Sequence, residues 1–446
     1  MMDRRTMLKS LAACAGTALL PARRSDAALP KASITRVKCW AHPSMNRTFN
    51  QSGLLVTVET DIGVTGIGEG GSPDLIRDLA GSVVGRNPFE IEKLWQHMYM
   101  DSFYPPGREK IHGQGAIDLA LWDIKGRVLQ VPVYDLLHGR LRDYVECYAT
   151  TFRPSTLPQA QGRAEQRGGA TSSGRGDPAQ PPAGGGAAAP AIAGTALRER
   201  ARAAMEAGYR VFRVDASIGG PIVGNVFSTH ERVRLVARAC KEIRDGVGEG
   251  DWMIDFHQKF DFADALRCCR LIEEYEPYLV EDPVRDEQAL EEIPKLRQMT
   301  TCPLAHGEEW GQRWNFHRLV YDKQIDYIRA TLPNVGGLTE MAKVMALCET
   351  SAVGIVPHFT GPVATAALVH AMATFSGPAL MEYNYGDQAP AYLPEFVTFK
   401  AGKLYPNDRP GLGVTVDFKA LTQIADFDQP RTTNTYRRPD GSLTHW

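Results

Sequence analysis

The sequence contains three short apolar runs that each lead to an acidic residue: Trp252-Met-Ile-Asp-Phe-His257, Leu279-Val-Glu-Asp-Pro283 and Leu304-Ala-His-Gly-Glu-Glu309. The acids Asp255, Glu281 and Glu308 are 26 and 27 residues apart, the length of one strand followed by one helix. Short apolar runs between helical segments are typical of buried parallel strands. We therefore expect three consecutive parallel strands, each with a carboxylate at its carboxyl end.

The same alternation extends over residues 145–383 and predicts an α/β fold, a (β/α)8 barrel of the TIM type. Most strand candidates are separated by roughly 20–30 residues, the length of one βα unit. They are Val145–Thr151, Arg210–Val214, Trp252–His257, Tyr278–Glu281, Pro303–Glu308, Tyr327–Ala330, Val353–His358 and Ala379–Glu382. Residues 154–196 interrupt this pattern with a composition rich in Gly, Ala, Pro, Ser and Gln, which predicts a solvated insertion rather than a lid.

Residues 34–140 predict a small α+β domain in front of the barrel. Two apolar runs flank Asp61-Ile-Gly63, which predicts a β-hairpin, and residues 74–100 and 110–138 have helical periodicity. Residues 384–446 contain too few strand or helix signals for another domain, so we expect them to pack on the N-terminal domain. A chain of 446 residues has room for both domains.

Composition and charge exclude several classes of protein. Fifty Lys and Arg oppose 52 Asp and Glu, and no long basic run exists, which excludes an electrostatic nucleic-acid binder. No apolar stretch in the body of the chain reaches the roughly 20 residues that a membrane span needs. The eight cysteines show no Cys-x-x-Cys spacing, which argues against a zinc finger or a thioredoxin-like site.

Residues 1–28 have the pattern of an export signal. The segment Asp3-Arg-Arg-Thr-Met-Leu-Lys9 precedes a short apolar stretch, Leu11–Leu20, and then the small-x-small pattern Ser25-Asp-Ala27. The adjacent arginines are typical of a twin-arginine signal, which carries folded proteins across the membrane. We expect a periplasmic or otherwise exported bacterial protein. The alternative is a disordered tail that happens to contain arginines.

The three acids predict a metal site at the barrel mouth. Adjacent parallel strands lie about 4.8 Å apart, so Asp255, Glu281 and Glu308 would converge and repel one another when ionised. A hard divalent cation relieves that repulsion, and ligation by oxygen alone favours Mg²⁺ over zinc. One acid alone could be a helix N-cap or a surface charge, but three in register favour the metal.

With this triad and the segment Ala116-Ile-Asp-Leu-Ala-Leu-Trp-Asp-Ile-Lys-Gly126, the sequence resembles the mandelate racemase/muconate lactonizing enzyme family of the enolase superfamily. The resemblance covers nearly the whole chain after residue 28. It implies that the N-terminal domain caps the barrel, with loops at Pro43–Gln51 and Asp101–Lys110 closing over the substrate. It further implies that Mg²⁺ binds a substrate carboxylate while a base removes the α-proton.

The resemblance also assigns catalytic roles to two histidines. His257 follows Asp255 by two residues, and strand periodicity points both side chains to the same face. A histidine there resembles the general acid of the acid-sugar dehydratases, which protonates the departing 3-hydroxyl. His358, at the end of the seventh strand, matches a histidine that acts as a base in the dehydratases and racemases of the family. For either residue the alternative is a group that only packs or hydrogen-bonds at the site.

Four further positions complete or depart from the family pattern, and we assign Arg213 to the catalytic residues and Asp215, Thr331 and Glu382 to the substrate-binding residues. Thr331 stands where the resemblance expects an aspartate beside His358, which weakens that histidine as a base. Arg213 and Asp215 replace two lysines of the racemases, and this argues against two-base racemisation. Arginine at that place resembles the mannonate-dehydratase branch. Glu382, at the end of strand eight, matches a glutamate that hydrogen-bonds the substrate carboxylate while protonated.

These observations favour a Mg²⁺-dependent sugar-acid dehydratase. It would take the α-proton from an aldonate or aldarate, expel the 3-hydroxyl and release a 2-keto-3-deoxy acid. One alternative is an epimerase or cycloisomerase acting on a sugar acid or lactone. Another is an exported, non-catalytic sugar-acid binding protein. The expected partners are a small-molecule sugar acid and further copies of the chain in a homo-oligomer.

Overall fold

The computed structural model describes residues 29–42, 53–102, 104, 106–150, 152, 194–219, 228–386 and 389–444. The predicted signal, the capping loop at 43–51 and most of the predicted insertion lie outside the described residues. The described residues from Ala32 onward form one compact unit. Among the described helices, none is long and apolar enough to cross a membrane.

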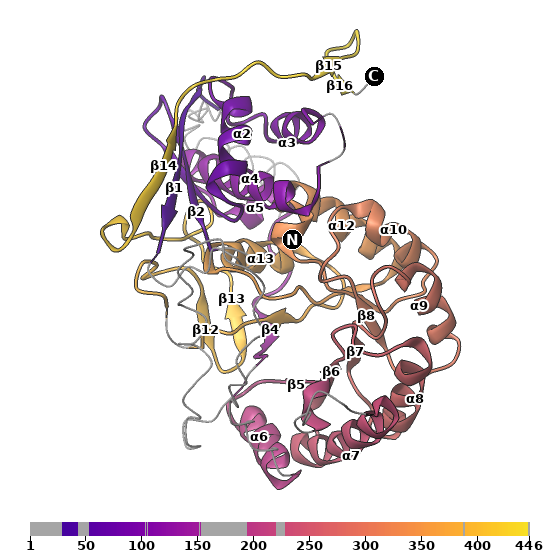
Figure 1. Cartoon of the computed structure of the whole chain (residues 1–446). Coiled ribbons are helices and arrows are strands. Elements are labelled where there is room, and N and C mark those ends of the chain that lie inside the picture. Colours follow the sequence, from indigo (N-terminus) through magenta and orange to yellow (C-terminus); the bar gives the residue numbers. More distant parts are fainter. Residues whose placement is uncertain are drawn as a thin grey trace, which may run out of the picture. The chain divides into compact units, whose positions relative to one another are not determined.

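The N-terminal domain consists of an antiparallel sheet covered by helices (Figure 1). The sheet has the order β14-β1-β2-β3, formed by β14 (Thr422–Phe427), β1 (Ile34–Ala41), β2 (Leu55–Thr60) and β3 (Thr65–Glu69). The hairpin between β2 and β3 turns at Gly63, whose φ of +74° suits glycine. The helices are α2 (Pro73–Val83), α3 (Ile91–Met100), α4 (Arg108–Leu129) and α5 (Val133–Leu137).

Two glycines of β3 bring α4 against the sheet. A Cβ on Gly66 would overlap the carbonyl of Ala120, and a Cβ on Gly68 would overlap the carbonyl of Ala116. The absence of a side chain at these two positions therefore lets the helix backbone lie directly on the sheet. This contact fixes α4, which also faces the barrel.

The barrel contains all eight predicted strands. The strands are β4 (Val145–Tyr148), β5 (Val211–Asp215), β6 (Asp251–Asp255), β7 (Leu279–Glu281), β8 (Leu304–His306), β9 (Tyr327–Ile328), β10 (Gly354–Ile355) and β11 (Met381–Glu382). Parallel ladders join β5 through β10 in sequence order, and another joins β11 to β4. A parallel bridge between Ile355 and Ala379 links these two sheets, and β4 lies next to β5. The structure thus confirms the barrel.

Helices surround the strands on the outside (Figure 1). The helices of this part of the chain are α6 (Gly194–Glu206), α7 (Thr229–Val247), α8 (Phe262–Ile272), α9 (Ala289–Arg297), α10 (Arg313–Tyr321), α11 (Leu332–Val335), α12 (Leu338–Ser351) and α13 (Pro362–Thr374). Short 3-10 turns lie at Ala216–Gly219, Glu273–Tyr275 and Phe418–Ala420. Residues 194–196, which the sequence assigns to the insertion, belong to α6. Strand alternation turns Ile254 toward the helices and Met253 toward the barrel interior, which places Asp255 above Met253 on the inner face.

The C-terminal segment contacts both domains. Strand β14 pairs with β1 in the N-terminal sheet, as expected. The hairpin of β12 (Thr398–Lys400) and β13 (Lys403–Tyr405) instead lies on the barrel, where β13 pairs with β4. The structure thus adds a contact with the barrel to the expected packing of this segment on the N-terminal domain. A last hairpin, β15 (Tyr436–Arg437) with β16 (Leu443–Thr444), follows.

Candidate active site

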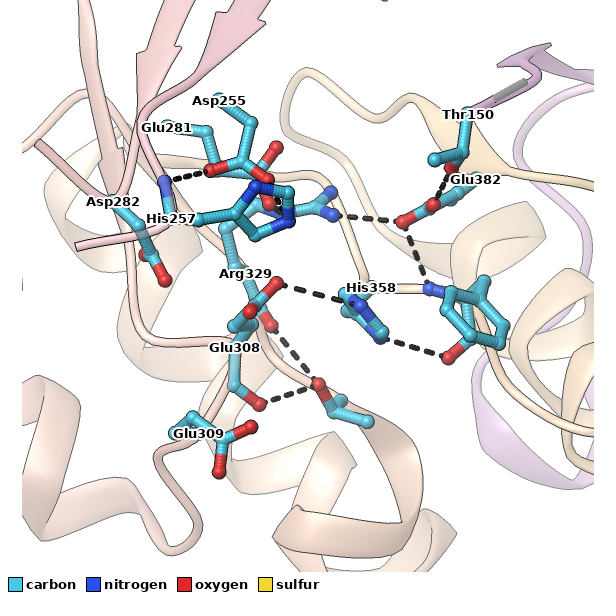
Figure 2. A network of polar contacts seen from close by, with 12 residues as sticks. Thr150, Asp255, His257, Glu281, Asp282, Glu308, Glu309, Arg329, His358 and Glu382 are labelled. Atoms are coloured by element: carbon cyan, nitrogen blue, oxygen red, sulfur yellow. Dashed lines mark hydrogen bonds and ion pairs between the residues drawn. The ribbon is translucent and has the colours of Figure 1, made fainter. Parts of the chain in front are cut away.

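Three carboxylates converge at the carboxyl ends of neighbouring barrel strands (Figure 2). One oxygen each of Asp255, Glu281 and Glu308 lies within 4.8 Å of the others. Asp255 and Glu281 are opposite each other in the ladder of β6 and β7. Glu308 does not end a strand as the sequence suggests, because β8 stops at His306. It reaches the cluster through a turn at Gly307, whose φ is +102°.

The cluster has more negative charge than its protein partners neutralise. Burial, together with the nearby acids, raises the pKa of Glu281 to about 8 and that of Glu308 to about 10. Glu281 Oε2 and Glu308 Oε2 are buried without a hydrogen-bond partner among the described residues. Carboxylate oxygens without a protein partner are suitable ligands for a hard divalent cation such as Mg²⁺.

Asp255 differs because two cationic groups contact it. Arg213, only 4% exposed, forms an ion pair with Asp255 Oδ2, and His257 Nε2 lies 2.6 Å from the same oxygen. Burial opposes ionisation, but Arg213 and His257 outweigh it and lower the pKa of Asp255. Burial would also lower the pKa of His257, whereas Asp255 raises it above its ordinary value.

A left-handed turn, rather than strand alternation, directs His257 into the site. Strand β6 ends at Asp255, and His257 has φ +48°. Its backbone N–H donates to Asp255 Oδ1 at 2.6 Å, which closes the turn and returns the imidazole over the carboxylate. The sequence predicts the correct face but attributes it to the wrong backbone geometry.

His358 approaches the triad from the other side (Figure 2). Its Nε2 is 3.4 Å from Glu308 Oε2, and its Nδ1 is 3.0 Å from the carbonyl oxygen of Phe359. A carbonyl can only accept, so Nδ1 carries the hydrogen and Nε2 has the lone pair. Burial lowers the pKa of His358 to about 4.

Arg329 is the site residue that the sequence analysis missed. Its guanidinium is fully buried just beyond β9 and donates to Glu281 Oε1 at 2.6 Å and to Glu382 Oε2 at 2.8 Å. An arginine directly after a buried strand was the available signal. Its link to two acids, 48 and 53 residues away in the chain, was not readable from that position.

Glu382 is a buried carboxylate, not a surface acid. Burial would raise its pKa, but His358, Arg329 and Arg213 lower it to about 2. Its oxygens also accept hydrogen bonds from the Phe359 backbone and from Tyr148 Oη. A pKa this low keeps Glu382 ionised at neutral pH, whereas the family resemblance implies a protonated form.

Two predicted substrate-binding residues have different positions. Thr331 is fully buried, and its hydroxyl donates to the Glu308 carbonyl at 2.7 Å, so it supports the turn instead of facing a substrate. Asp215 ends β5 opposite Asp255, about one third exposed, with Oδ1 accepting from the Ser217 backbone at 2.7 Å. It remains at the rim of the site.

Comparisons with known proteins match both domains of this fold. A family model described as mandelate racemase/muconate lactonizing enzyme, N-terminal domain, matches residues 32–138, and one described as enolase C-terminal domain-like matches residues 196–420. A D-galactonate dehydratase from Xanthomonas euvesicatoria is 31% identical over 410 residues, which cover 88% of this chain and 96% of that protein.

Two solved structures extend the comparison. An enolase from Agrobacterium radiobacter, determined with sodium and L-malate bound, has 26% identity and a TM-score of 0.70, covering 92% of this chain and 99% of that one. The 3,6-anhydro-D-galactonate cycloisomerase from Zobellia galactanivorans has 25% identity and a TM-score of 0.68, covering 87% and 97%.

Proposed function

Because the chain belongs to the mandelate racemase/muconate lactonizing enzyme family of the enolase superfamily, we propose that it is a Mg²⁺-dependent sugar-acid dehydratase. The reaction converts an aldonate or aldarate into a 2-keto-3-deoxy acid and water. The similarity to D-galactonate dehydratases makes D-galactonate the first substrate to test. These dehydratase relatives identify the chain as an enzyme of the lyase class, so a non-catalytic binding protein is not favoured.

One observation carries the proposal. Three carboxylate oxygens lie within 4.8 Å of one another, with His257 against Asp255 and His358 against Glu308. The four acids Asp255, Glu281, Glu308 and Glu382 outnumber the two guanidiniums that they face, Arg213 and Arg329, so their full ionisation leaves an excess of negative charge over the arginines. A divalent cation matches that excess.

Asp255, Glu281 and Glu308 would hold the metal. When bound, Mg²⁺ would fix the substrate carboxylate and stabilise the negative charge that develops as the α-proton leaves. Arg213 and Arg329 hold Asp255 and Glu281 in place and remain protonated, so they position carboxylates and do not exchange protons.

The two histidines then divide the proton transfers. His358 Nε2, with its lone pair directed to the site, takes the proton from C2. His257 delivers a proton to the 3-hydroxyl, so the C3–O bond breaks and water leaves. The resulting enol becomes the 2-keto acid when C3 takes a proton and the enol hydroxyl releases one. General acid–base catalysis of this kind contributes about 10²- to 10⁴-fold to a rate.

A cycloisomerase is the second candidate. A solved structure of that name is 25% identical to this chain, and Thr331 stands where a base-supporting aspartate is expected. The same α-proton abstraction would then open a ring by expelling an internal ether oxygen, without release of water.

Proton NMR in D₂O with Mg²⁺ distinguishes these reactions. D-Galactonate and other sugar acids are incubated with the protein and, as a control, with Glu281→Gln. Loss of the H2 signal together with a new 3-deoxy signal, from a C3 that has taken one deuteron, supports dehydration. Loss of H2 with every hydroxyl retained indicates epimerisation, and turnover of an anhydro-sugar acid alone indicates a cycloisomerase. No exchange on any acid contradicts the proposal.

A further inference from the structure

We propose that His112 of the N-terminal domain positions Glu308 through Asn334, so that docking of this domain on the barrel tunes the affinity of the metal site. The inference rests on the proposed function, because it assumes that Glu308 binds Mg²⁺. His112 lies in the first turns of α4, and Asn334 lies in α11. Both act through their neighbours as positioning residues.

Glu308 depends on its backbone more than the other two ligands do. Asp255 pairs with Arg213, and Glu281 pairs with Arg329, whereas Glu308 has no arginine partner among the described residues. Glu308 also lies beyond the end of β8, outside the parallel ladder. The main-chain contacts of the turn therefore determine where its carboxylate lies.

The carbonyl oxygen of Glu308 is anchored by two side chains. Asn334 Nδ2 donates to it at 2.6 Å, and Thr331 Oγ1 donates at 2.7 Å. Asn334 and Thr331 are both fully buried, so no bulk water replaces either donor. Loss of the amide donor would leave a buried carbonyl with one partner fewer and allow the turn to shift.

His112 fixes the orientation of that amide. Because Asn334 Nδ2 donates to Glu308, Oδ1 is the acceptor that faces His112 Nε2, with which it forms a hydrogen bond. The side chain of His112 is 1% exposed, so the bond is protected from solvent. A reversed amide would lose both interactions. The N-terminal domain therefore selects the amide rotamer that holds Glu308.

Close packing keeps His112 at this position. A Cβ on Gly115 would lie only 3.0 Å from Gly337 N, so α4 contacts the backbone that follows α11 directly. Arg108 precedes His112 by four residues and thus lies on the same face of α4, where it forms an ion pair with Glu309. One helix face therefore contacts Glu309 directly through Arg108 and acts on Glu308 through Asn334.

The test is the Mg²⁺ affinity of the full chain, measured by isothermal titration calorimetry. Groups that orient metal ligands typically change affinity about 10- to 100-fold when removed. We expect His112→Phe and Asn334→Ser to raise the Kd for Mg²⁺ by that factor. His112→Gln keeps a donor on a similar side chain, and we expect it to restore most of the affinity.

Trp122→Phe is the matched control. Trp122 also lies on α4, and its Nε1 donates to Thr339 Oγ1 at 2.9 Å across the same interface, away from Glu308. We expect this variant to melt at a lower temperature with the Kd unchanged. If His112→Phe does not fold, Asn334→Ser and His112→Gln provide the same comparison.

Three outcomes separate the hypotheses. Weaker Mg²⁺ binding by His112→Phe and Asn334→Ser, with binding by Trp122→Phe unchanged, supports the inference. If His112→Phe and Asn334→Ser bind Mg²⁺ with the affinity of the wild type, the inference is overturned and the proposed function stays intact. A wild type that binds no Mg²⁺ overturns the proposed metal site and this inference together.

Discussion

Arg329 Nε donates a hydrogen bond to Glu281 Oε1 over 2.6 Å, and both side chains are fully buried. The same guanidinium reaches Glu382, which lies on the opposite side of the site. One arginine therefore holds a metal-ligand candidate and the acid of the eighth strand in a common arrangement. Since the planar fork contacts two separate carboxylates, an ammonium group would not reproduce this geometry.

Replacement of Arg329 should destabilise the fold and abolish turnover. Arg329→Met leaves two buried carboxylates without their partner, a change that costs about 3–5 kcal/mol. Urea denaturation measures the loss of unfolding free energy. We expect Arg329→Lys to recover only part of the stability. A Met variant as stable as the wild type would contradict the bridging role.

Mg²⁺ should stabilise the wild type and not Glu281→Gln. A ligand at 100 times its Kd adds about 2.7 kcal/mol of stability, which a thermal melt detects. The control is Glu340→Gln, because Glu340 is equally buried but pairs with Arg313 away from the triad. Retention of the Mg²⁺ response by Glu281→Gln would place the metal elsewhere.

Substitutions of the two histidines should have different effects on H2 exchange in D₂O. His358→Gln removes the proposed base, so we expect both H2 exchange and dehydration to fall by about 10²- to 10⁴-fold. His257→Gln removes the proposed acid, so H2 exchange continues while loss of the 3-hydroxyl stops. NMR measures both rates in one sample. Exchange that is lost in His257→Gln and kept in His358→Gln would reverse the assignment.

Glu69 should make stability depend on pH near neutrality. It is buried at the end of β3, accepts from the Val363 and Ala364 backbones at the start of α13, and burial raises its pKa to about 7. The folded state therefore holds a proton that the unfolded state releases above pH ~4.3. The stabilisation from that proton is complete below pH ~4.3 and is lost as pH rises through 7.

Glu69→Gln carries no such proton, so its stability relative to the wild type should rise with pH. We expect the difference to grow by roughly 2–3 kcal/mol between pH 5 and pH 8. Denaturant melts at the two pH values measure it. A difference that is the same at both pH values would exclude Glu69 as the titrating group.

Gly337→Ala should be far more damaging than Gly63→Ala. Both glycines have positive φ, +96° and +74°, so each alanine meets a backbone cost of about 1–2 kcal/mol. A Cβ on Gly337 would also overlap the Asp118 side chain, whereas nothing lies within 4 Å of a Cβ on Gly63. Comparison of their unfolding free energies isolates the packing of α4 on the barrel. Equal losses would contradict that close contact.

The sequence alone was sufficient for the barrel and for the convergence of the three acids. Each strand is a short apolar run, and the spacings of 26 and 27 residues place Asp255, Glu281 and Glu308 on consecutive units. In a parallel barrel every unit returns the chain to the same end, so local patterns determine which side chains share the mouth. This explains why the eight strands and the convergence of the acids were predictable.

Only the tertiary structure decided how those side chains are held. The turn at Gly307, the burial of Thr331 under Glu308, and the bridge from Arg329 to Glu382 depend on neighbours in space. His112 and Asn334 are 222 residues apart in the chain and meet only because two domains pack together. Local patterns carry no information on such contacts. The two residues of each contact lie on elements far apart in the sequence, and only the packing of these elements in space sets the distance between them.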